Sequence, residues 1–68
     1  MVFVVAQKRL GKYIVNLVKE GNTFQIEVYK EGLIDYVYCV WVGADFDYAV
    51  KTYYKTIAEY EEKEAKGE

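Results

Sequence analysis

Residues 13–28 read YIVNLVKEGNTFQIEV, two runs in which apolar residues recur at every second position, joined at Gly21-Asn22. A glycine at this point supplies the positive φ that a two-residue hairpin turn requires. Such a turn pairs Leu17 with Ile26 and creates one apolar face, formed by Tyr13, Val15, Leu17, Phe24, Ile26 and Val28. A slip of one residue in the pairing would place polar side chains on the apolar face. The sequence pattern of the hairpin therefore predicts its register.

Short connections extend this hairpin into a sheet. The β-branched and aromatic runs predict four strands, at about residues 2–7, 12–19, 23–30 and 34–42. The first two strands are joined by a turn at KRLG, 8–11, and the last two by EGL, 31–33. Connections this short require antiparallel neighbours, because a parallel pair needs a crossover of about a dozen residues. The sequence therefore predicts a four-stranded antiparallel meander.

The last third of the chain changes to a helical period. Asp45 is a suitable N-cap, and Asp47 places a carboxylate in the first turn, where the helix dipole favours it. The helix is predicted at about 45–64, with a frayed charged end at 65–68. Its apolar stripe consists of Phe46, Ala49, Val50, Tyr53, Ile57 and Tyr60. Because this stripe must pack on the sheet, residues 1–68 are expected to form a single α+β domain of order β-β-β-β-α.

The fourth strand is apolar on both faces, so its orientation depends on the turn before it. A two-residue turn at Glu31-Gly32 places the small side chains and the indole under the helix, namely Val37, Cys39 and Trp41. A three-residue turn reverses the faces. We favour the first arrangement because small side chains let the helix approach, whereas tyrosine hydroxyls need water or a partner. Carried into the first strand, the same alternation turns Val2, Val4 and Ala6 inward.

The opposite sheet face then has no chain segment to cover it. A solvated antiparallel face is usually polar, and a large apolar patch usually marks an interaction site. The candidate interaction face gathers the remaining apolar and aromatic side chains, which are Phe3, Val5, Ile14, Val18, Tyr29, Tyr36, Tyr38 and Val40.

Three interpretations of this face are open. It is a solvated sheet surface, or it binds a second copy or another protein, or its tyrosines stack on single-stranded nucleic acid. The order of four strands and a helix resembles the layout of small single-strand DNA-binding folds, which implies a nucleic-acid partner. The candidate phosphate contacts are Lys8, Arg9 and Lys12, but Glu27 on the same face repels phosphate. The net charge of −2 creates no long-range attraction for nucleic acid or membranes. Self-association or binding of a protein partner is therefore the favoured interpretation.

Catalysis and cofactor binding find little support in the residue types present. The chain has no histidine and no serine, which removes the usual general base and the commonest hydroxyl nucleophile. Its one cysteine, Cys39, forms neither an intrachain disulfide nor a thiolate zinc site. The five glycines are scattered and make no phosphate-binding loop. We expect a non-enzymatic protein without cofactor or metal.

Two further expectations concern compartment and composition. No stretch approaches the roughly 18 apolar residues of a membrane helix, and the first positive charges follow the opening apolar run instead of preceding it. A cytoplasmic protein with a reduced thiol is therefore expected. The abundance of Lys and Glu, with no proline or histidine, is similar to the bias of hyperthermophile proteins.

Overall fold

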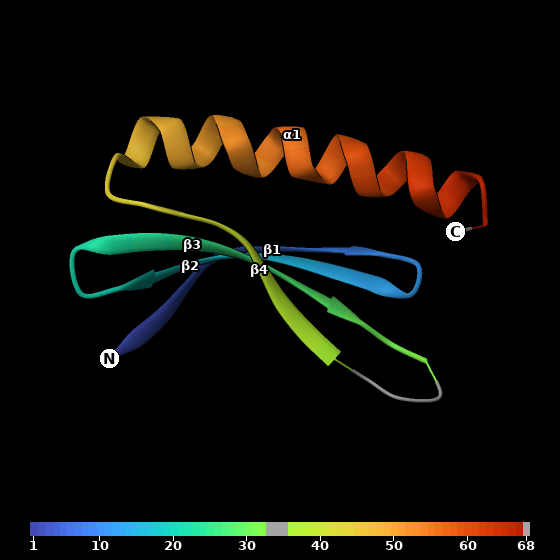
Figure 1. Cartoon of the computed structure of the whole chain (residues 1–68), viewed down its shortest axis with the longest axis horizontal. Coiled ribbons are helices and arrows are strands. Elements are labelled where there is room, and N and C mark those ends of the chain that lie inside the picture. The colour runs from blue at the N-terminus through green and yellow to red at the C-terminus, as the bar shows by residue number, and fades with distance from the viewer. Residues whose placement is uncertain (33–35, 68) are drawn as a thin grey trace.

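The computed structural model of this chain describes residues 1–32 and 36–67. Within them lie four strands, β1 (Val2–Leu10), β2 (Tyr13–Glu20), β3 (Thr23–Lys30) and β4 (Tyr36–Gly43), and one helix, α1 (Phe46–Ala65). The strands form one antiparallel sheet in the order β1-β2-β3-β4, and α1 lies along one face of it (Figure 1). The predicted α+β meander with a C-terminal helix is confirmed. No helix in the described part of the chain is both long and apolar enough to cross a bilayer.

The β2–β3 hairpin has the predicted register, with Leu17 opposite Ile26. Gly21 takes a φ of 59°, as the turn requires. The apolar face of the hairpin packs under α1 and forms the core together with the helix residues Ala49, Tyr53, Ile57 and Tyr60. We call this the helix side of the sheet and the opposite one the open face.

Helix α1 begins as the sequence indicates. Asp45 is the N-cap, and its Oδ1 accepts a hydrogen bond from the Tyr48 N–H at 2.9 Å. The predicted stripe is buried at Ala49, Tyr53, Ile57 and Tyr60 and partly buried at Val50. Phe46, at its start, is half-exposed, although its ring lies 5.3 Å from that of Phe24. Thr56 is also buried, although a polar residue was not expected in the buried stripe. Its hydroxyl donates a hydrogen bond to the Thr52 carbonyl within the helix, which satisfies the polar group.

The first turn differs from the prediction. Residues 8–11 do not form it, since β1 continues to Leu10 and the chain reverses at Gly11-Lys12. Gly11 has a φ of 59°, so the glycine again lies at the point of reversal. The charged residues Lys8 and Arg9 suggested a loop, but an edge strand accommodates charged side chains because one of its sides faces water.

A β-bulge reverses the expected faces of the first half of β1. Val5 is the extra residue between two regular pairs, Val4 with Val18 and Ala6 with Leu17. Ala6 faces the helix side as predicted, but Val2 and Val4 belong to the open face and Phe3 to the helix side, the opposite of the prediction. One inserted residue changes the alternation of every residue before it.

A second bulge lies in β4, at Val40. Tyr38 pairs with Val28 and Trp41 with Ile26, so both belong to the helix side. The prediction is correct for Trp41 and wrong for Tyr38. It is also wrong for Val37 and Cys39, which are exposed on the open face. The expected start of this strand at residue 34 lies outside the described residues.

The first turn provides a test of the fold. Gly11 has a positive φ, and a Cβ there would collide with the carboxyl group of Glu64 near the end of α1. We expect Gly11→Ala to lower the free energy of unfolding by about 1–2 kcal/mol, the penalty for a left-handed non-glycine residue, plus any contribution from displacing Glu64. Denaturant unfolding followed by circular dichroism measures this change.

Gly21→Ala is the matched control, because Gly21 has the same φ and no atom within 4 Å of its added Cβ. The difference between the two variants isolates the contact with Glu64. Equal stability of Gly11→Ala and the original chain would contradict the described turn.

Candidate interaction surface

The predicted interaction face is only partly assembled. Ile14 and Tyr29 pair on the open face and are partly buried. Val5 and Val40 are exposed, but each is the inserted residue of a bulge. Val18 belongs to the open face by its pairing, yet only 3% of it is exposed. So little of this valine is exposed that it cannot contribute to a contact with a partner.

The other three predicted members do not join this face in the described structure. Phe3 is exposed, but on the helix side. Tyr38 also lies on the helix side and packs against the core. Tyr36 pairs with Lys30, and its side chain lies outside what the structure describes. The open face therefore lacks Tyr38, which the nucleic-acid interpretation needs as a stacking surface.

Four exposed valines take the place of these residues on the open face. They are Val2, Val4, Val37 and Val42. With the two bulges, the alternation of side chains along β1 and β4 places these valines on the open face. The sequence does contain a signal for the first two, since VFVV at residues 2–5 is apolar at four consecutive positions and cannot be covered on one face alone.

The centre of the open face is polar. One row across the sheet contains Gln7, Asn16, Glu27 and Cys39. Asn16 Oδ1 is buried without a hydrogen-bond donor among the described residues. Glu27 forms no ion pair or side-chain hydrogen bond with any residue in 1–32 or 36–67. An apolar partner covering this row would remove an unpaired carboxylate from water, which is strongly unfavourable.

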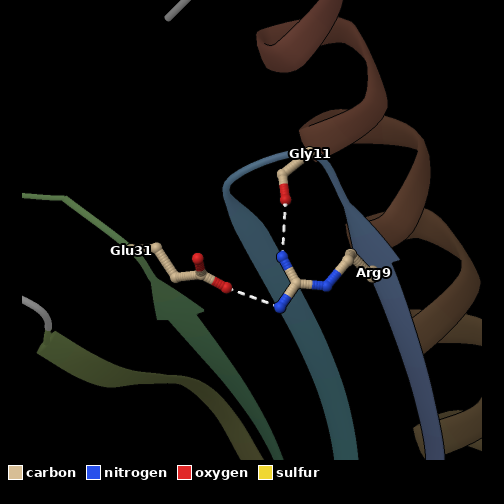
Figure 2. A network of polar contacts seen from close by, with 3 residues as sticks. All are labelled: Arg9, Gly11 and Glu31. Carbon is tan, nitrogen blue, oxygen red and sulfur yellow. Dashed lines mark hydrogen bonds and ion pairs between the residues drawn. The ribbon is translucent and has the colours of Figure 1, made fainter.

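The three candidate phosphate contacts, Lys8, Arg9 and Lys12, do not share one surface. Lys8 pairs with Val15 and Arg9 with Ile14, so the two lie on opposite sides of the sheet. The Arg9 guanidinium donates to the Gly11 carbonyl at 3.0 Å and pairs with Glu31, as Figure 2 shows. The ammonium of Lys12 lies 5.6 Å from the Tyr13 ring centre. The three side chains therefore do not form a single phosphate-binding site.

The inward-turned Tyr38 joins an aromatic cluster at the far end of the helix. Its hydroxyl lies 2.9 Å from the Tyr60 hydroxyl, with either as donor. The Tyr60 ring in turn contacts the edge of the Tyr13 ring, with centres 4.9 Å apart. A buried tyrosine needs such a partner for its hydroxyl, and α1 supplies it here.

The remaining features of the described part of the chain are its lack of pockets and of clustered metal ligands. Residues 1–32 and 36–67 enclose no pocket and bring together no group of three potential metal ligands. Cys39 is exposed, and its thiol lies 3.3 Å from the Trp41 carbonyl oxygen as a weak donor. Comparison with protein-family models, curated proteins and solved structures finds no match. The case for a function therefore comes from the surface itself.

The environment of Tyr38 predicts a loss of stability at high pH. Burial, and secondly the hydrogen bond to Tyr60, raises the pKa of Tyr38 well above its ordinary value of about 10. Burial also raises the pKa of Tyr53, whose hydroxyl donates to the Val15 carbonyl. Because the pKa of each tyrosine is higher in the folded than in the unfolded chain, its protonated hydroxyl contributes fully to stability below a pH of about 10. This contribution is lost as the pH rises from about 10 through the raised pKa of the folded state.

Denaturant unfolding at neutral and alkaline pH measures this loss. Tyr38→Phe should lower the free energy of unfolding at neutral pH by about 0.5–1.5 kcal/mol, through loss of the hydrogen bond. Its further decline above pH of about 10 should be shallower than in the original chain, because one partly buried phenol no longer has to ionise. The same alkaline decline in both proteins would contradict the packing of Tyr38 against the core.

Proposed function

We propose that this protein is a non-catalytic assembly module that associates with a second copy of itself. The observation that carries the proposal is the exposure of the apolar run VFVV. Each side chain from Val2 to Val5 is between 44% and 60% exposed. Burying a valine or phenylalanine side chain contributes about 1.5–3 kcal/mol, so such a run is a strong source of association.

The exposed apolar side chains gather at one end of the molecule. In an antiparallel meander of four strands, the start of β1 and the end of β4 lie at the same end of the sheet. Helix α1 begins there too, beside the β2–β3 turn (Figure 1). The exposed large apolar residues at this end are Met1, Val2, Phe3, Val4, Val5, Val40, Val42, Phe46 and Tyr48. A concentration of this kind favours a protein contact over simple solvation.

The size of the chain supports a second copy as the partner. A domain of about 60 residues buries only about 60% of the surface of its unfolded chain, and small domains often gain stability by oligomerisation. The nucleic-acid alternative draws less support, because Tyr38 packs toward the helix and Arg9 is engaged with Glu31. Its test is a titration with single-stranded oligonucleotide at low salt, where steep salt dependence would favour it.

Sedimentation equilibrium over a wide concentration range tests self-association. We expect a reversible monomer–dimer equilibrium in the original chain. Val4→Glu should raise the dissociation constant by about tenfold or more, because burying the exposed 60% of Val4 contributes about 1–2 kcal/mol and the glutamate adds the cost of removing a carboxylate from water.

Tyr54→Glu is the control for the added charge, because Tyr54 is similarly exposed but lies on the helix, outside the VFVV run. It should leave the equilibrium unchanged. A strictly monomeric original chain at every concentration would refute the proposed function.

A further inference from the structure

Strand β1 differs from every other strand in lacking cover on both faces along its first half. Among the described residues it pairs only with β2, so it is an edge of the sheet. Its second half packs on the core through Ala6 and Leu10. Its first half leads away from α1 toward the N-terminus (Figure 1). There Val2 and Val4 are exposed on the open face and Phe3 on the helix side.

This arrangement determines what kind of group can cover the segment. A partner lying on the open face would leave Phe3 exposed on the other side. A neighbouring strand covers part of every side chain on both faces at once. It also pairs the backbone N–H and C=O groups that an edge strand leaves free. The occupant with the matching chemistry is therefore an extended apolar segment.

We infer that two copies join β1 to β1 in antiparallel orientation around a two-fold axis perpendicular to the sheet, centred on Phe3. This inference rests on the proposed self-association and specifies its geometry. Phe3 then lies opposite its own copy on the helix side. Val2 lies opposite Val4 of the second copy on the open face. The product is a continuous antiparallel sheet of eight strands with both helices on one side.

The charge pattern selects this register. Residues Val2–Val4 carry no charged side chain, and pairing them with themselves brings only apolar side chains together. Lys8 and Arg9 lie beyond the paired segment. A register centred on Lys8 would instead place two ammonium groups directly opposite each other, which is unfavourable across a strand pair.

The charge pattern also favours the edge over the open face. Stacking two open faces would bury Glu27, for which the described residues supply no cation. Removing an unpaired carboxylate from water is more costly than leaving part of a valine surface exposed. Edge pairing leaves Glu27 hydrated, because it lies on β3, two strands away from the contact.

Two matched substitutions distinguish edge pairing from face stacking. Phe3 and Val42 are 57% and 56% exposed, on opposite edges and opposite faces of the sheet. Edge pairing predicts that Phe3→Glu raises the dissociation constant at least about tenfold, while Val42→Glu changes it by less than about twofold. The reverse order of effects would overturn edge pairing and support face stacking, leaving self-association intact.

Hydrogen exchange on the original chain supplies a test that needs no substitution. Backbone amides of the Val2–Val4 segment that face the free edge should exchange slowly under dimeric conditions and rapidly under monomeric ones. A dimer without added protection in this segment would overturn the inference alone. A chain that stays monomeric at all concentrations would overturn both the inference and the proposed function.

Discussion

The register of the β2–β3 hairpin is the constraint on which the rest of the structure depends. Val15 and Ile26 are completely buried beneath α1, and a slip of one residue would put Asn16 or Glu27 there instead. The Tyr53 hydroxyl reinforces this arrangement by donating to the Val15 carbonyl at 3.1 Å, which ties the middle of the helix to the middle of the sheet. The two outer strands, β1 and β4, are placed by their pairing with this hairpin.

The bulges then decide which side chains the outer strands bring to the core. Tyr38 and Trp41 are three positions apart, so strict alternation would place them on opposite faces of β4. The extra residue at Val40 puts both under the helix. Phe3 and Ala6 are related in the same way by the extra residue at Val5. In each edge strand, one inserted valine exchanges the faces of a whole half-strand.

The sequence contains strong signals for the central elements and weak ones for the edges. The hairpin was predictable because its polar and apolar residues alternate, and the start of the helix because Asp45 is a good N-cap. The bulges were not predictable, because valine fits either face and no polar residue in VFVV or YVYCVWV marks the change of alternation. The candidate face therefore included the exposed Val5 and Val40 but assigned Phe3 and Tyr38 to the wrong side.

The same bulges limit how far the proposed association can extend. A bulge interrupts the regular spacing of backbone groups, so only Val2–Val4 of β1 lie in an uninterrupted segment. Head-to-tail pairing of β1 with β4 of another copy would have to align two bulged edges, and it would leave a free β1 at one end and a free β4 at the other, to which further copies could add. Pairing β1 of one copy with β1 of another uses only the residues before Val5. The two-fold symmetry of this contact limits the assembly through β1 to two copies. The two bulges, which change the faces of the side chains in the edge strands, therefore also favour a closed dimer over an open fibre.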